Sequence, residues 1–331
     1  RSAPRIYHRL THYHTMGRLG RTPTSNLTGN QIMAKYRDYL PQIDGDFFLT
    51  RGGLETTSVL QGNVDVSHCA AIELMKTDKG RARLRAYYAP YIDIARDAGA
   101  GFILEAPTWR ANTDWGQRLG YTAASLSAAN RAAIEMLHGM RIAQEDRLAI
   151  VVSGSIGPRR EGCTEADEMH PREAARYHKP QTEAFADADA DLITATNMTN
   201  MNEAIGTIIA AKIEGILAVI SFSVAKDGHL PTGQNLWDAI AAVDIATNEA
   251  AAYYMIDCAH MSRLDTILAR HGVLRGRLRG LRAIGLARIG EYKDILNRYP
   301  SINILDGDGG MNRRQREELS KAGQAAFRSA A

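Results

Sequence analysis

Short apolar segments alternate with longer amphipathic segments along most of the chain, from about residue 47 onward. The short segments have the composition and length of buried strands, whereas the longer ones have the apolar spacing of helices. Regular alternation of the two is typical of repeated β-α-β units and a parallel sheet. The predicted strands span residues 47–50, 101–105, 148–154, 191–197, 216–224, 253–258, 282–287 and 302–306.

The segments between the strands show helical spacing and recognisable helix ends. Leu84, Tyr88 and Ile92 lie four residues apart ahead of Gly99, which predicts a helix that stops at the glycine. Pro171 stands at a position where the first turn of a helix tolerates proline. The strand–helix repeats predict an α/β fold of the (β/α)8, or TIM-barrel, type.

An open, doubly wound sheet of the dinucleotide-binding kind is the alternative architecture. That fold places G-x-G-x-x-G after its first strand, whereas only the pair Gly52-Gly53 follows the first predicted strand here. The sequence also contains no G-x-x-x-x-G-K-[ST] phosphate loop. The barrel is therefore the preferred fold class.

Charge is distributed unevenly along the 331 residues. The formal net charge is +3, but seven basic residues precede the first acidic residue, Asp38, which leaves 33 basic and 37 acidic groups, a net charge of −4, for the rest. An acidic body argues against a nucleic-acid-binding surface. Residues 1–36 are expected to form a flexible N-terminal extension, because their first 32 residues lack acids and sustained apolar periodicity, and residues 37–331 a single barrel domain.

Cysteine content and hydropathy exclude further classes of protein. The three cysteines, Cys69, Cys163 and Cys258, are odd in number and widely spaced, which fits neither a disulfide framework nor a paired zinc-finger cluster. No apolar run approaches the roughly 20 residues that span a bilayer. We expect a cytoplasmic protein without membrane or nucleic-acid partners, and a homo-oligomer is compatible with the sequence.

Polar and ionisable residues follow nearly every predicted strand. The loops after the strands of a barrel surround one common mouth, so these residues are expected to converge there. They are more numerous than a packed core needs. In chain order they are Arg51, Glu55, Glu105, Thr108, Trp109, residues 153–158, Thr196, Asn197, Ser223, Asp227, Cys258, His260, Asp306 and Asp308.

Short motifs in and around these strands, taken in order, resemble the homocysteine S-methyltransferase family over about residues 47–325. They are residues 52–57 (GGLETT), 103–110 (ILEAPTWR) with 114–116 (DWG), 153–158 (SGSIGP), 188–192 (ADADL), 220–223 (ISFS) with 227–233 (DGHLPTG), and 254–260 (YMIDCAH). The resemblance implies a barrel that binds zinc and homocysteine. The bound homocysteine would accept a methyl group from a small-molecule donor. Together with the strand-end argument it predicts substrate-binding roles for Arg51, Gly52, Gly53, Glu55, Thr56, Glu105, Thr108, Trp109, Ser153, Thr196, Asn197, Ser223 and Asp257.

The chain departs from the family at the expected zinc ligands. The family uses three thiolates, of which Cys258 matches the first, whereas Asp308 and Gly309 stand where an adjacent cysteine pair belongs. Thiolate-bound zinc lowers the pKa of a substrate thiol. Cys258 and Asp308, with His260, would instead form a mixed zinc site better suited to a polarised carbonyl or water. The alternative is that no metal binds and Cys258 is a small buried apolar residue.

Further departures leave three functions open. Arg51 replaces the family's usual aspartate and favours a carboxylate or phosphate, and Asp257 replaces an asparagine. The first hypothesis is methyl transfer to a thiol or another soft nucleophile. The second is a diverged barrel that binds or converts an acidic small molecule through Arg51, with Asp306 or Asp308 as an acid–base group. Asp308 and His260 are the predicted catalytic residues. The third is a catalytically silent partner subunit.

Overall fold

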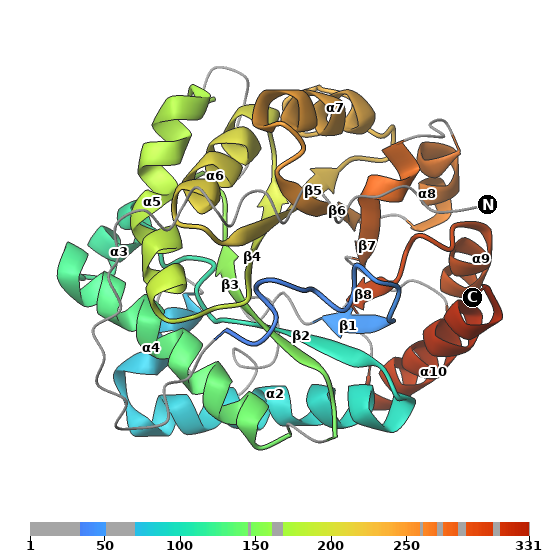
Figure 1. The fold of residues 1–331 in the computed structure, drawn as a ribbon, viewed down its shortest axis with the longest axis horizontal. Coiled ribbons are helices and arrows are strands. Elements are labelled where there is room, and N and C mark those ends of the chain that lie inside the picture. The colour runs from blue at the N-terminus through green and yellow to red at the C-terminus, as the bar shows by residue number, and fades with distance from the viewer. Residues whose placement is uncertain are drawn as a thin grey trace.

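The strands of the protein form a closed parallel barrel. The computed structural model describes residues 34–50, 70–144, 147–160, 168–258, 261–269, 274–283, 289–306 and 312–330. Its strands are ordered sequentially, and β8 pairs with β1 to close the ring (Figure 1). They are β1 (Phe48–Thr50), β2 (Gly101–Glu105), β3 (Ile150–Ile156), β4 (Leu192–Met198), β5 (Leu217–Val224), β6 (Ala251–Cys258), β7 (Leu278–Ala283) and β8 (Ile304–Asp306).

Helices surround the barrel and complete the predicted (β/α)8 fold (Figure 1). Pro171 begins α5, and Gly99 ends α2 in the left-handed conformation, as the sequence predicted. Among the described helices, none combines the length and apolar character that crossing a bilayer requires. They are η3 (Ala71–Lys76), α2 (Asp78–Ala98), α3 (Thr113–Arg118), α4 (Ala123–Ile142), α5 (Pro171–Asp187), α6 (Met201–Ile213), α7 (Leu236–Thr247), α8 (Met261–Leu268), η5 (Leu274–Arg277), α9 (Ile289–Arg298) and α10 (Arg313–Ala330).

Strand β7 lies four residues earlier than predicted, at Leu278–Ala283 instead of residues 282–287. The apolar residues after Arg282 favoured the later position. In the structure Leu281 pairs with Ile256 of β6 and Leu305 of β8, which places Arg282 within the strand. A charged residue is tolerated there because carboxylates inside the barrel balance it. The other strand boundaries agree with the prediction to within two residues.

The inside of the barrel changes from apolar to polar along its axis. Residues two apart on a strand face the same side, so a strand can direct an apolar residue inward near its start and a polar residue inward near its end. The apolar layer nearer the start of the strands consists of Phe48, Ile103, Val151, Leu192, Val219, Tyr253, Met255 and Ile304. Closer to the carboxyl ends lies a buried polar layer of Thr50, Glu105, Ser153, Thr194, Ser221, Asp257, Arg282 and Asp306.

The segment that precedes β1 packs against the apolar end of the barrel. Leu40 is buried within the apolar layer. The Arg37 guanidinium donates hydrogen bonds to the carbonyl oxygens of Ala186 (3.2 Å) and Ala190 (2.8 Å). The side-chain amide of Asn303 donates to the Gln42 carbonyl at 2.7 Å. This segment covers the apolar end of the barrel, so ligands are expected to bind at the opposite, polar end.

Replacing Leu40 with alanine tests this packing. We expect Leu40→Ala to lower the free energy of unfolding by about 2–5 kcal/mol, because it leaves a cavity against the apolar layer. The control is Tyr39→Ala, since Tyr39 is 48% exposed and its loss is expected to be much smaller. Urea denaturation of both variants measures the difference. Equal losses would mean that Leu40 does not contribute to the barrel core.

Candidate active site

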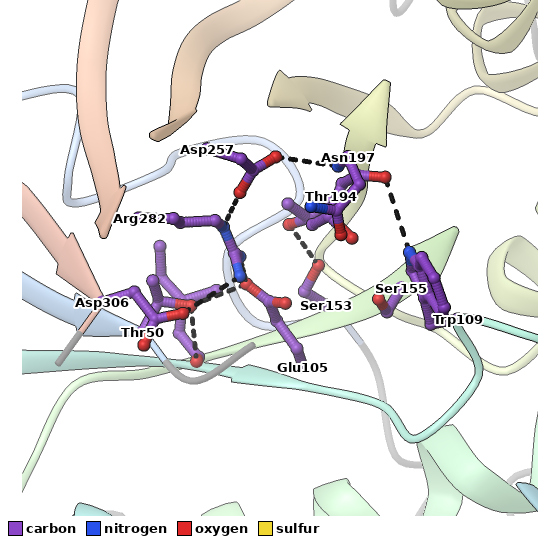
Figure 2. A network of polar contacts seen from close by, with 12 residues as sticks. Thr50, Glu105, Trp109, Ser153, Ser155, Thr194, Asn197, Asp257, Arg282 and Asp306 are labelled. Atoms are coloured by element: carbon purple, nitrogen blue, oxygen red, sulfur yellow. Dashed lines mark hydrogen bonds and ion pairs between the residues drawn. The ribbon is translucent and has the colours of Figure 1, made fainter. Parts of the chain in front are cut away.

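A single buried guanidinium lies at the centre of the polar layer. The side chain of Arg282 is only 6% exposed and is surrounded by three carboxylates (Figure 2). Its Nη2 contacts Glu105 Oε1, its Nη1 lies 3.3 Å from Asp306 Oδ2, and its Nε lies 3.8 Å from Asp257 Oδ1. Because arginine stays protonated, this arrangement places a fixed positive charge among three acids.

The strand register brings these groups together. Arg282 is paired with Asp257 on β6 and with Asp306 on β8, so both carboxylates flank it on neighbouring strands. Glu105 lies at the end of β2, where the Thr50 hydroxyl donates a 2.6 Å hydrogen bond to its Oε1. The cluster therefore depends on residues that are far apart in the sequence.

Burial and the charges of neighbouring groups shift the pKa values of this cluster in opposite directions. Burial raises the pKa of Glu105 and of Asp257, although the Arg282 guanidinium counteracts the shift for both. Burial would lower the pKa of Arg282, but Glu105, Asp306 and Asp257 together raise it above its ordinary value. Three carboxyl groups share one guanidinium here, so when at least two of them are ionised this part of the mouth favours positive charge in a ligand.

The end of β4 is shaped to complete the cluster. Asn197 has a left-handed backbone, with φ of 58°, next to an irregularity in the pairing with β5. Its backbone N–H donates a 2.8 Å hydrogen bond to Asp257 Oδ2 (Figure 2). Asparagine tolerates this conformation better than most residues, and such strain gathers at functional sites. The Thr196 carbonyl beside it accepts a hydrogen bond from Trp109 Nε1 at 3.5 Å.

Two hydroxyl groups on neighbouring strands continue the polar layer. The hydroxyls of Ser153 and Thr194 are hydrogen-bonded to each other at 2.8 Å (Figure 2). Thr108 is fully buried, and its hydroxyl donates to the Ser155 carbonyl at 2.8 Å, which ties the loop after β2 to β3. Thr108 thus supports the loop that carries the half-buried Trp109.

The structure brings several of the predicted site residues to one end of the barrel. Glu105, Trp109, Ser153, Asn197 and Asp257 lie in the same polar region (Figure 2). Ser223 is half-buried on β5 in register with Asp257, and the backbone of Cys258 ends β6. The predicted residues Arg51, Gly52, Gly53, Glu55, Thr56, His260 and Asp308 lie outside the described residues.

The sequence analysis missed Arg282, Thr50 and Thr194 as members of the site. The rule that residues two apart share a face identifies all of them once the strand positions are known. The misplacement of β7 concealed Arg282, because the prediction made it the first residue of a strand instead of an inward-facing residue near its end.

The side chains of the predicted zinc ligands Cys258, His260 and Asp308 lie outside the described residues. No group of three histidine, cysteine, aspartate or glutamate residues within the described residues is arranged to hold a metal ion. Asp257 accepts a backbone hydrogen bond and faces a guanidinium, which would repel a dication. No chemical step through zinc follows from this arrangement.

A closed (β/α)8 barrel with polar side chains gathered at the carboxyl ends of its strands is the architecture of barrel enzymes. The chain belongs to the homocysteine S-methyltransferase family, whose sequence profile matches residues 50–297.

Solved structures of the homocysteine methyltransferase MmuM from Escherichia coli share the fold. The oxidized form superimposes with a TM-score of 0.67 at 17% identity, over 83% of this chain and 95% of MmuM. The metallated form gives a TM-score of 0.63 at 15% identity, over 83% and 96% of the two chains. The apo form gives 0.60 at 18% identity, over 84% and 96%. No curated protein sequence matches the chain at a significant level.

Removing the guanidinium tests the charge balance of the cluster. We expect Arg282→Met to lower the free energy of unfolding at neutral pH by about 3–5 kcal/mol, because it leaves buried carboxylates without their partner. Arg313→Met is the matched control, since Arg313 pairs with Glu317 on the exposed face of α10. Urea denaturation measures both variants. A loss no larger than that of the control would show that the carboxylates do not need Arg282.

The raised pKa of Glu105 predicts a pH-dependent stability difference. The folded protein holds this proton more tightly than the unfolded chain, so the stability contributed by Glu105 declines as pH rises from about 4 through the folded pKa. Glu105→Gln removes the titration. The unfolding free energy of the variant minus that of the parent should therefore increase with pH and then level off. A decrease over this range, measured by urea denaturation, would mean that Arg282 lowers the pKa of Glu105.

Proposed function

We propose that the protein transfers a methyl group from a cationic donor to a soft nucleophile, such as the thiol of an amino acid, at the polar end of the barrel. Membership of the homocysteine S-methyltransferase family supports methyl transfer as the class of reaction. The observation that carries the proposed donor charge is the excess of buried carboxylates around Arg282.

A sulfonium or quaternary ammonium donor matches this electrostatic environment. Charges interact strongly where water is excluded, so the carboxylates favour an onium group and the ammonium of an amino-acid acceptor. During transfer the acceptor loses its proton to water, and its lone pair then forms a bond to the methyl carbon. The bond from that carbon to the onium atom breaks, and its electron pair stays on the departing sulfur or nitrogen. The demethylated donor loses its onium charge, which weakens its attraction to the carboxylates.

Trp109 supports a cationic donor by a second interaction. Its indole N–H points to the Thr196 carbonyl at 3.5 Å, a weak hydrogen bond that helps to orient the ring. Gly157 permits its close approach, since a Cβ at that position would lie 2.7 Å from Trp109 Nε1. Tryptophan faces attract onium groups by cation–π interactions. The ring is therefore proposed as part of the donor site.

Zinc is not part of the proposed mechanism. Cys258 is the one thiolate that the sequence retains at the family's ligand positions. The polar cluster next to it is organised around a guanidinium instead of a metal ion. We therefore propose that transfer does not require the three-thiolate zinc site, and that treatment with a chelator leaves activity intact.

The second hypothesis, an acidic ligand held by Arg51, predicts the opposite ligand charge. Arg51 and Asp308 lie outside the described residues, so the hypothesis stands on the sequence alone. The carboxylates around Arg282 would repel an acidic, negatively charged ligand. A screen of ligands of opposite charge therefore separates the two hypotheses, because a ligand that binds only the folded state raises its melting temperature.

The proposed function is tested by incubating the full chain with homocysteine and one methyl donor at a time. We expect methionine to form with S-methylmethionine or betaine, two onium donors, and not with methylfolate, as measured by mass spectrometry. Glu105→Gln should raise the KM for the onium donor about tenfold, because it removes one buried negative charge. Glu317→Gln on the surface of α10 is the control and should leave the KM unchanged.

Two results would overturn the proposal. One is transfer from methylfolate alone. The other is thermal stabilisation by dicarboxylates with no response to either onium donor or to homocysteine, which would favour the acidic-ligand hypothesis.

A further inference from the structure

Trp109 lies on a turn whose flanking residues are buried. Between residues 102 and 112 only Trp109 and Arg110 are partly exposed. Thr108 and Ala111, on either side of them, are fully buried. The Ala111 N–H donates a hydrogen bond to the Thr108 carbonyl at 2.9 Å, which closes the turn. The turn therefore has a buried base and presents two side chains toward the outside of that base.

Two buried side-chain amides hold this turn from outside the barrel. Gln181 of α5 and Asn130 of α4 are 3% and 2% exposed, and both helices lie outside the ring of strands (Figure 1). Gln181 Nε2 donates to the Thr108 carbonyl at 2.8 Å, and Asn130 Nδ2 donates to the Ala111 carbonyl at 3.1 Å. Gln181 Nε2 also lies 3.3 Å from Asn130 Oδ1, so the two amides are joined to each other.

The barrel holds the same turn from the other side. The Gly157 N–H, directly after β3, donates to the Trp109 carbonyl at 3.1 Å. The Thr108 hydroxyl donates to the Ser155 carbonyl of β3 at 2.8 Å. The carbonyls of Thr108, Trp109 and Ala111 thus each accept a hydrogen bond from a different segment of the chain. The backbone of Trp109 cannot shift without breaking one of these bonds.

The orientation of Gln181 shows that its amide is directed at the turn. Its Nε2 faces the carbonyl oxygens of Thr108 and Ser155, and only a nitrogen donor fits between two acceptors. A buried amide loses its hydrogen bonds to water, so it is favourable only where the protein replaces them. Apolar side chains would fill the space between α4 and α5 without this requirement. The two amides are therefore accounted for by the turn that they hold.

We propose that Gln181 and Asn130 are positioning residues that hold Trp109 in place for the cationic methyl donor. A ring that is ordered before the ligand binds loses little conformational freedom on binding, so its full cation–π attraction contributes to affinity. That the ligand is an onium donor rests on the proposed function. The support of Trp109 rests on the hydrogen bonds to its turn.

Calorimetric binding of S-methylmethionine and of homocysteine to the full chain tests this role. Asn130→Leu and Gln181→Met remove the amides and keep similar side-chain volumes. We expect each variant to weaken S-methylmethionine binding about fivefold, the equivalent of one cation–π contact. Binding of homocysteine should be unchanged, because its thiol has no positive charge for the ring to attract.

Asn303→Leu is the matched control. Asn303 is also buried, and its amide also donates to two backbone carbonyls, those of Gln42 (2.7 Å) and Asp46 (2.6 Å), but at the apolar end of the barrel. Asn303→Leu should lower the melting temperature, as Asn130→Leu does, and leave both affinities unchanged. Equal weakening of S-methylmethionine by the two variants would refute the positioning role, because it would reflect a general loss of stability.

The indole N–H signal of Trp109 reports on the ring directly. The chain has three tryptophans, and the indole signal that is missing from the nitrogen–proton NMR spectrum of Trp109→Leu identifies the one from Trp109. Gln181→Met should shift or broaden this signal, whereas Asn303→Leu should not. An unchanged signal in Gln181→Met would mean that the amide does not position the ring.

Hydrogen exchange in the parent protein does not depend on the variants folding. The amide hydrogens of Ala111 and Gly157 fasten the turn and should exchange slowly, and rapid exchange of both would refute a fixed turn. The positioning role is also refuted if Trp109→Leu weakens S-methylmethionine binding while Asn130→Leu and Gln181→Met do not. Failure of the proposed function has a different signature. In that case Trp109→Leu leaves S-methylmethionine binding unchanged, while Gln181→Met still shifts the Trp109 signal.

Discussion

The buried charge of Arg282 is the constraint on which the polar end of the barrel depends. A guanidinium cannot be removed from water unless opposite charges and hydrogen-bond acceptors of the protein take the place of the water. Here the replacements come from β2, β6 and β8, so the charge is satisfied only when the ring of strands has closed. The ionic cluster and the closure of the barrel are therefore coupled.

The barrel separates stability from chemistry along its axis. The apolar layer, with Leu40 packed against it, supplies core packing at one end, whereas the other end carries the acids and hydroxyls. Family membership accounts for the fold and the reaction class. What distinguishes this member is its local charge balance, because a cluster of acids around the Arg282 guanidinium lies on the strands next to Cys258. A site of this kind selects ligands by charge and hydrogen bonding.

Much of the site followed from the strand-end rule. Glu105, Ser153 and Asn197 were predicted because each comes at or near the end of an apolar strand, where barrel loops converge, whereas Asp257 was predicted from the family resemblance. Arg282 was not, since an arginine beside an apolar run resembles a strand boundary. Its inward direction depends on pairing with β6 and β8, and pairing between distant segments leaves little local signal.

The sequence by itself determined the alternation of strands and helices, the family, and the acidic body behind a basic start, because periodicity, motif order and composition are local properties. The tertiary structure decided which carboxylates share Arg282. It also decided that Asn197 supports Asp257 through its backbone. These features arise from strand register and ring closure, which bring Glu105 and Arg282, 177 residues apart in the chain, within contact distance.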